Sequence, residues 1–510
     1  MMPLLLAAII LTGTSCKKYL YEPPITSTYG ASFWSSQAAV EQASLAMYGQ
    51  LRASLRNSAS FFLFGDLASG TFIPAAGQWN YQTIRADNAP PYNFSYVPYL
   101  EGDLQNWSRF YRVIAQANLV LQNVPKMPAA NFRSEVIRNA YIGEALFIRA
   151  YTYFYITRVW GDAVYVSQTF DDIDYGKIPP IARTPEATVL DSCIADLKKA
   201  AGYMDFSGGD IQKTVRANKG SVSALLAHIY AWKHDYANAH LYCQKVINNG
   251  GYELEPMSSY TNIWKGKSSN ESILELPMQF QPNDAEFPKQ TDGNYYDWAE
   301  AQFNFFGTFV KGNVVDNANT SCWLSPDNGM VDWFFDYADA RYNSVWKHVP
   351  ASGGDVSGYM LLKYTNFQYQ KPDTKTLPYI NNNLVLFRLS DIILLDAEAL
   401  ASTGNLEGAR AALSKTEDRA GIATYLNPGN TSDMLDEVVM ERGRELFGEG
   451  TWYYDLIRTE EAQGWLEAVG YPSDGRLSKA NKGYYWPLDM GTLFPYDNLL
   501  TQNPWWAVHK

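Results

Sequence analysis

Two stretches of this chain place aromatic side chains among amide, charged and glycine residues, without the spacing of a helix or a strand. They lie within residues 61–106 and 294–323. Exposed rings stack on the C–H faces of sugar rings, and nearby amide and charged groups hydrogen-bond sugar hydroxyls. The residue types therefore indicate a surface suited to a glycan. Its candidate ligand-binding residues are Trp79, Asn80, Tyr81, Arg85, Tyr96, Tyr295, Tyr296, Trp298 and Trp323.

Core packing is the competing role for these rings, because aromatic residues most often pack inside a protein. Half or more of them are expected to fill an irregular part of the fold. The aromatics of residues 327–337, DNGMVDWFFDY, fit the packing face of a helix, and we assign them to the core.

Motifs of catalysis or metal binding do not accompany the rings. His228, His234 and His240 are six residues apart, which turns about 240° per step on a helix. The sequence lacks H-E-x-x-H, paired C-x-x-C, G-x-S-x-G, G-x-G-x-x-G and P-loop motifs. A glycosidase pair is defined by its separation in space, so an enzyme remains the lesser alternative. We predict a non-catalytic binding protein without a cofactor or a metal ion.

Composition narrows the class of protein further. The chain has 510 residues, is 46% hydrophobic and carries a net charge of −12. It is therefore globular, and an acidic surface argues against binding of nucleic acid.

The N-terminus predicts the compartment. Pro3–Leu11 is an apolar run too short to span a bilayer, and small residues follow it up to Cys16. A cysteine at this place resembles the bacterial lipobox, where the thiol is lipidated after cleavage. We predict a signal peptide over 1–15, a lipidated Cys16 and a tether over 16–34; the alternative is an ordinary signal peptide with an incidental cysteine. The other three cysteines form no disulfide framework, and Cys193 and Cys243 are expected to be buried thiols.

Helices are the elements that must position the aromatic segments. Residues 135–162 are apolar on every side and predict a central helix packed on several faces, ended by Gly161. Helical hairpins with close-packed alanines are expected at 218–249, with a turn at 233–235, and at 384–416, with a turn at 403–405. Such hairpins resemble tetratricopeptide repeats. Other helices are expected from Ser35 or Ser36 to about Arg52, over 107–124, and from Thr184-Pro185-Glu186 to about 203, with Thr184 as the cap and proline at the first position. A helical pair is expected over 433–458 and a strand at SILELPMQF.

Several of these segments together resemble the SusD/RagB family of bacterial outer-membrane lipoproteins. GEALFIRAYTYFYITRVWGDAVYV is similar to the family's most typical helix, and LVLFRLSDIILLDAEALASTGN to its later hairpin. DEVVMERGRELFGEGTWYYDLIRT and the terminal QNP also match, in the family's order and after a lipobox. The resemblance implies a mainly α fold, in which tetratricopeptide-like hairpins pack against an irregular, loop-rich lobe with short strands.

The same resemblance implies a partner and a ligand. Such lipoproteins cap a SusC-like TonB-dependent outer-membrane transporter and deliver captured glycan to it; capture of peptide or protein is the alternative. It also implies a lipid-anchored protein of the bacterial outer membrane, at the cell surface, although Lys17-Lys18 stands where surface-exported lipoproteins often have acidic residues. We expect residues 35–510 to form a single fold. Its helical lobe would be mainly 35–56, 104–250 and 384–460, and its ligand-binding lobe mainly 57–103, 251–383 and 461–510.

Charged residues inside the apolar helices are expected to hold the fold together. Glu144 and Arg149 are predicted to join a buried ion-pair network. The charges of 441–445 have spacings suited to mutual pairing, and Asp391, Asp396 and Glu398 are expected to tie helices to one another.

Overall fold

Helices dominate the structure of this protein, and its strands are short, which confirms the predicted mainly α class. The structure is a computed structural model that describes residues 32–74, 102–169, 180–206, 214–266, 269–278, 305–306, 324–326, 328–350, 357–423 and 429–509. None of the described helices is both long and apolar enough to cross a membrane.

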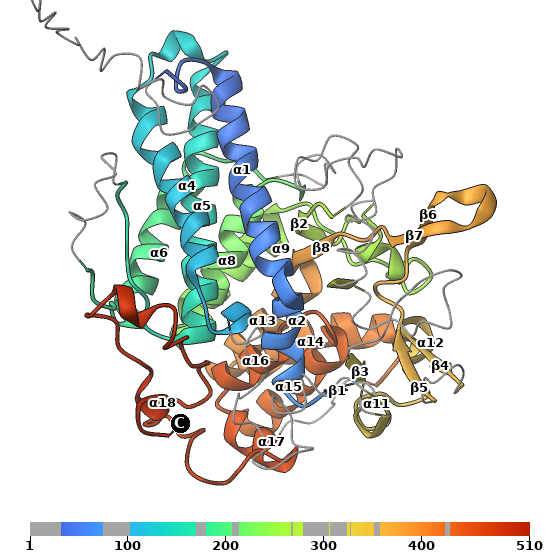
Figure 1. Ribbon diagram of the computed structural model, residues 1–510. Coiled ribbons are helices and arrows are strands. Elements are labelled where there is room, and N and C mark those ends of the chain that lie inside the picture. Colours follow the sequence, from blue (N-terminus) through green and yellow to red (C-terminus); the bar gives the residue numbers. More distant parts are fainter. Residues whose placement is uncertain are drawn as a thin grey trace, which may run out of the picture.

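Three long helices lie side by side at one end of the molecule (Figure 1): α1 (Gln37–Arg56), α4 (Ser108–Asn123) and α5 (Glu135–Trp160). α5 is the predicted central helix. The Ser134 hydroxyl caps its first turn by accepting the Ile137 N–H, and Gly161 ends it with a φ of 76°. Every side chain from 141 to 157 is buried. Burying large apolar side chains such as Phe147 and Ile148 contributes about 1.5–3 kcal/mol each, so α5 organises this part of the core.

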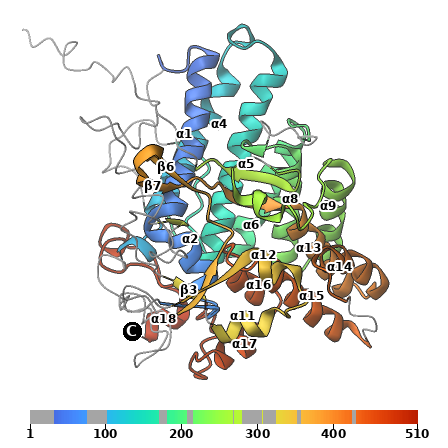
Figure 2. The same ribbon diagram turned by 90° about the vertical axis from the view of Figure 1, so that its right-hand side faces the viewer.

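Helical hairpins continue from α5 (Figure 2). α6 (Glu186–Ala201) packs against α5 and then against α8 (Lys219–Trp232), which pairs with α9 (Tyr236–Asn249). α9 in turn contacts α13 (Leu389–Ser402), which pairs with α14 (Leu406–Ala420) and contacts α15 (Thr431–Glu445). The turns fall at the predicted residues 233–235 and 403–405. Successive hairpins that bury one another are typical of tetratricopeptide-like folds.

Strands form four antiparallel pairs in the part of the chain that the structure describes. The pairs are β1 (Phe72–Pro74) with β3 (Leu324–Pro326), β2 (Ser272–Leu276) with β8 (Leu384–Arg388), β4 (Trp346–Val349) with β5 (Gly358–Leu361), and β6 (Phe367–Lys371) with β7 (Thr376–Ile380). The remaining helices are short: α2 (Ser60–Phe62), α11 (Asn328–Phe334), α12 (Ala340–Val345), α16 (Trp452–Arg458), α17 (Ala462–Ala468) and α18 (Pro504–Val508).

Three sequence predictions were wrong in detail. Residues 61–67 were expected to lack helical spacing, yet they belong to α2 and a π-helical turn, because Phe61 and Phe64 pack against the Tyr155 ring. Thr184 was expected to cap α6. It instead bridges to Ala163, and the Asp162 carboxylate accepts the Glu186 N–H at 2.9 Å. The stretch 384–388 was placed in a helical hairpin, but it forms β8 against β2.

Candidate functional site

The sequence-predicted ligand contacts all lie outside the described residues, as does Cys16. They are Trp79, Asn80, Tyr81, Arg85, Tyr96, Tyr295, Tyr296, Trp298 and Trp323. The structure does describe the two strands from which the aromatic segments start and end, and these strands are a pair.

β1 and β3 join the two aromatic segments at one place. Pro74 opposes Leu324 in the antiparallel register of this pair. The part of the first aromatic segment that holds its candidate ligand residues follows Pro74, with Trp79 five positions later, and the second segment ends at Trp323, immediately before Leu324. One end of each segment is therefore held by the same pair of strands.

β1 and the chain before it are fixed by hydrogen bonds and packing to residues 447–471, which include α16 and α17. The Tyr471 hydroxyl donates to the Ala68 carbonyl at 2.6 Å, and the Trp465 indole N–H donates to the Ser69 carbonyl at 2.8 Å. Phe72 is fully buried, with its ring 5.2 Å from that of Phe447. Because buried polar groups that lose their partners are costly, these bonds hold β1 in one position.

α11 follows β3 and divides its aromatic residues between the core and the surface. Phe334 is buried and packs edge-to-face on Trp452, with ring centroids 5.5 Å apart. Gly443 of α15 admits this ring, since a Cβ there would lie 2.4 Å from Phe334 Cε1. Trp333 points away from the core and is 56% exposed. The same short helix thus packs one ring, Phe334, into the core and exposes the ring just before it, Trp333.

Trp333 stands at the edge of a cavity of about 750 Å³, which we name the tryptophan pocket. Its ring lies 5.3 Å from that of Trp465, which in turn meets Trp452 edge-to-face at 5.4 Å. The lining is mostly apolar and comes from α11 and α15–α17, which meet at the lower end of the view in Figure 2. It consists of Gly329, Met330, Trp333, Asp436, Val439, Met440, Trp452, Leu456, Glu461, Gly464, Trp465, Ala468 and Val469.

Two exposed carboxylates supply the charge of this pocket. Partial burial, and then the neighbouring Asp436 carboxylate, raise the pKa of Glu461. Both groups accept hydrogen bonds, while the Trp333 ring offers an apolar face. An apolar hollow of this size with a few polar groups is typical of small-molecule sites. The arrangement can hold a ring-shaped polyhydroxylated ligand.

The sequence interpretation of residues 327–337 was therefore partly wrong. Phe334 and Phe335 are buried as predicted, and Val331 is buried with them, but Trp333 and Tyr337 are exposed, Tyr337 by 77%. The buried residues recur at i, i+3 and i+4, which leaves Trp333 on another face of the helix. That spacing was the signal available in the sequence.

The charged residues that stand out in the sequence form ion pairs that stabilise the fold. The Glu144 carboxylate lies 2.7 Å from the Arg216 guanidinium, and Arg149 lies 2.8 Å from Asp196. Glu144 and Arg149 are thus both in buried ion pairs, as predicted, although each binds a different partner. The nearby Ser44 hydroxyl also donates to Glu144 at 2.6 Å.

The charges of 441–445 mostly bind other elements and not one another. Glu441 does pair with Arg444 at 2.9 Å. Arg442 instead reaches Asp391, and Glu445 reaches Arg388 and Arg341. Helical spacing alone predicted mutual pairing, but these side chains lie between packed helices and strands, where long-range partners are closer.

Helix-tying roles are confirmed for the three acidic residues of α13. Asp391 contacts Arg442 of α15, Asp396 lies 2.7 Å from His240 of α9, and Glu398 lies 2.6 Å from Arg458 of α16. Cys193 and Cys243 are free, buried thiols, and burial raises the pKa of each. No group of His, Cys, Asp and Glu within the described ranges is arranged to hold a metal ion.

Comparisons with known proteins agree with this architecture. Residues 310–506 match the family model described as "SusD family", and residues 20–231 match the one described as "Starch-binding associating with outer membrane". A SusD-like protein of Formosa agariphila is 24% identical over 93% of this chain and 92% of its own. A SusD superfamily protein of Bacteroides thetaiotaomicron superposes with a TM-score of 0.71 at 22% identity, over 93% of this chain and 99% of that one.

A further solved structure, named as a laminarin-binding SusD-like protein, superposes with a TM-score of 0.70 at 20% identity. The match covers 92% of this chain and 99% of that one. These structures share the fold, and the two family models together reach both halves of the sequence. The chain belongs to the SusD/RagB family.

Proposed function

We propose that this protein captures a glycan on a surface composed of the tryptophan pocket and the two aromatic segments that start from β1 and β3. The observation that carries the proposal is the pairing of Pro74 with Leu324. This pair brings the ends of both segments to one place, and Trp333 follows β3 directly on α11. The described end of each segment thus lies at one strand pair, and α11 with Trp333 follows that pair in the chain.

The chemistry of the tryptophan pocket supports a saccharide as ligand. Trp333 exposes a rigid apolar face, and a sugar ring stacks on such a face without losing the hydration of its equatorial hydroxyls. Asp436 and Glu461 supply acceptors at the rim. The description of the matching family model as starch-binding and the name of the laminarin-binding neighbour also favour glycan over peptide.

Anchoring and delivery form the second part of the proposal. Cys16 would carry the lipid that holds the chain at the outer membrane, on the cell surface, and a SusC-like TonB-dependent transporter would receive the glycan. The family model's phrase "associating with outer membrane" supports the location. The protein would bind and release its ligand unchanged, without catalysis.

Calorimetric titration of the lipid-free protein with starch, laminarin and other oligosaccharides, and with a matched panel of peptides, tests the binding function. We expect saturable binding of a glycan, which chromatography recovers at its original length. Shortened products would show an enzyme. Saturable binding of peptides alone would favour the peptide-capturing alternative.

Membrane fractionation tests the anchor separately. The full chain expressed in its own host should sediment with the outer membrane and co-purify with a transporter after mild solubilisation. Cys16→Ala should move to the soluble fraction while keeping its affinity for glycan. Continued sedimentation of Cys16→Ala would contradict lipid anchoring.

A further inference from the structure

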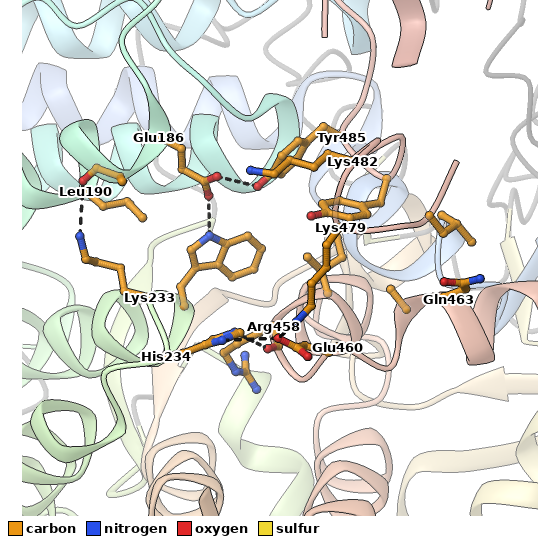
Figure 3. A pocket seen from close by; sticks show the side chains of 16 residues that line it. Glu186, Leu190, Lys233, His234, Arg458, Glu460, Gln463, Lys479, Lys482 and Tyr485 are labelled. Carbon is orange, nitrogen blue, oxygen red and sulfur yellow. Dashed lines mark hydrogen bonds and ion pairs between the residues drawn. The ribbon is translucent and has the colours of Figure 1, made fainter. Parts of the chain in front are cut away.

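A second cavity of about 600 Å³ lies against other residues of α16 and α17 (Figure 3). We name it the lysine pocket. Its walls come from α6, from the end of α8 with the following turn, from α16–α17 and from the tail over 477–485. The lining residues that carry the argument are Glu186, Trp232, Glu460, Lys479, Lys482 and Tyr484. This volume falls in the range of small-molecule sites.

Both carboxylates that line the lysine pocket are already engaged. Glu186 accepts the Trp232 indole N–H at 2.5 Å and the Tyr485 hydroxyl at 2.7 Å. Glu460 lies 2.5 Å from the Lys479 ammonium, and the His234 ring lies 3.6 Å from it on the other side. Figure 3 shows these contacts at opposite walls of the cavity. Both carboxylates thus already bind donors of the protein itself.

One cation of the lining, Lys482, forms no direct ion pair with a described residue, although its charge opposes the rise that burial causes in the pKa of Glu186. Lys233 pairs with Asp191 at 2.6 Å, and Arg458 pairs with Glu398 at 2.6 Å. The Lys482 ammonium forms no ion pair or hydrogen bond with any residue that the structure describes, and it lies 6.0 Å from the centre of the Tyr485 ring. A ligand in this pocket can therefore bind the Lys482 ammonium through a hydrogen-bond acceptor, and a negatively charged acceptor binds it most strongly.

The backbone holds Lys482 at this position. Its φ of 49° lies in the left-handed region, which a lysine rarely occupies. The turn is closed by the Lys482 N–H to the Ser478 carbonyl at 2.9 Å and by the Gly483 N–H to the Arg476 carbonyl at 2.7 Å. Non-glycine residues kept in such conformations are found most often at functional sites. The lysine is presented to the pocket by a defined turn.

Tyr484 provides the complementary apolar surface. Its ring is half-buried on the wall of the pocket, and its hydroxyl has no hydrogen-bond partner among the described residues. A ligand with one acid group and one ring face can use both side chains at once. A free inorganic anion would use only Lys482.

We propose that the lysine pocket binds an acidic monosaccharide such as a uronate, with its carboxylate at the Lys482 ammonium and its ring face on Tyr484. This site is separate from the tryptophan pocket and takes a ligand of defined charge. It therefore does not depend on which glycan the tryptophan pocket binds.

Calorimetric titration with glucuronate tests the site, with glucose as the uncharged match. Lys482→Gly removes the ammonium and also suits a φ of 49°, so it should keep the melting temperature of the wild type. Lys482→Arg keeps the charge. Lys199→Ala is the matched control, because Lys199 is exposed near the far end of α6 from Glu186.

We expect glucuronate to bind the wild type, Lys482→Arg and Lys199→Ala with similar Kd, and Lys482→Gly about tenfold or more weakly. Trp333→Ala, which disables the tryptophan pocket, should keep the wild-type Kd for glucuronate, and glucose should give no saturable binding to this variant. No binding of glucuronate, equal binding of glucose, or an unchanged Kd in Lys482→Gly would overturn the proposal. Binding of inorganic sulfate in place of glucuronate would also overturn it, because the ring face would then have no part.

Discussion

Pro74 and Leu324 are partners across the antiparallel β1–β3 pair, although they belong to different halves of the chain. The part of the first aromatic segment that holds its candidate ligand residues begins after one of these residues, and the second segment ends before the other. The contacts of Phe72, Ala68 and Ser69 with residues 447–471 fix this junction. A junction held in this way fixes the chain where it enters that part of the first aromatic segment and where it leaves the second, shortly before Trp333 in the sequence.

The aromatic segments themselves yield the first prediction. Trp79→Ala and Trp298→Ala should each weaken glycan binding in titration without changing the melting temperature, because the rings are predicted to contact ligand. A large fall in melting temperature with either substitution would instead assign that ring to the core.

The two carboxylates of the tryptophan pocket should make it bind neutral glycans more tightly than acidic ones. Asp436 and Glu461 are the charged residues of its lining, so a sulfated or uronate-containing oligosaccharide meets like charge there. Asp436→Asn combined with Glu461→Gln should strengthen binding of the acidic oligosaccharide about fivefold relative to a neutral one with the same backbone, a gain of ~1 kcal/mol.

The gain should shrink at high salt, because exposed charges are screened. Asp373→Asn, at an exposed turn outside this lining, serves as the control. An unchanged ratio of the two affinities in the double variant would show that the rim does not select by charge.

Regular elements were predictable from the sequence because short-range spacing determines them. Gly161 ends α5, and the turns of both hairpins follow from their alanine patterns and turn residues. The family could also be predicted from its sequence motifs. In contrast, the pairing of β1 with β3 joins two three-residue strands, and no local spacing predicts which distant partner such a strand finds.

Long-range partners also explain why charges were only partly predicted. Arg341 binds Glu441 and Glu445, and Arg388 binds Glu271, Glu445 and Glu449. Neither arginine has a spacing in the sequence that indicates these partners. The exposure of Trp333 was missed for a different reason, since its neighbours Phe334 and Phe335 made the whole stretch look like core.

Glycine 443 tests the packing that supports α11. Gly443→Ala should lower stability by about 1–3 kcal/mol despite the better helix propensity of alanine, because the new Cβ would lie 2.4 Å from Phe334 Cε1. Gly49→Ala in α1 is the matched control: no atom lies within 4 Å of the new Cβ, and stability should rise by about 0.5–1 kcal/mol. Urea unfolding measures both. Equal stabilisation by the two substitutions would contradict the close packing at Gly443.

A buried carboxyl in α14 should make stability depend on pH. Burial, and then the nearby Glu441 and Glu437 carboxylates, raise the pKa of Glu417 to about 8. The folded protein therefore binds more protons than the unfolded chain between about pH 4.5 and pH 8. Stability should fall as the pH rises through this window.

Glu417→Gln removes that dependence. Relative to the wild type, it should gain at least about 1 kcal/mol in unfolding free energy between pH 5 and pH 9. Glu407→Gln, at an exposed position of the same helix, should follow the wild type. Parallel pH profiles for the wild type and Glu417→Gln would show that this carboxyl does not titrate differently on folding.

Trp333 gives the most direct test of glycan capture beside the strand junction. The measurement is the calorimetric Kd for the best-binding oligosaccharide of the panel, in the wild type, Trp333→Ala and Tyr337→Ala. Both side chains are exposed aromatics, but Trp333 lines the tryptophan pocket and Tyr337 does not. We predict a Kd about tenfold or more higher for Trp333→Ala and nearly unchanged for Tyr337→Ala, with equal melting temperatures. An unchanged Kd in Trp333→Ala, or an equal loss in both variants, would contradict the proposed site.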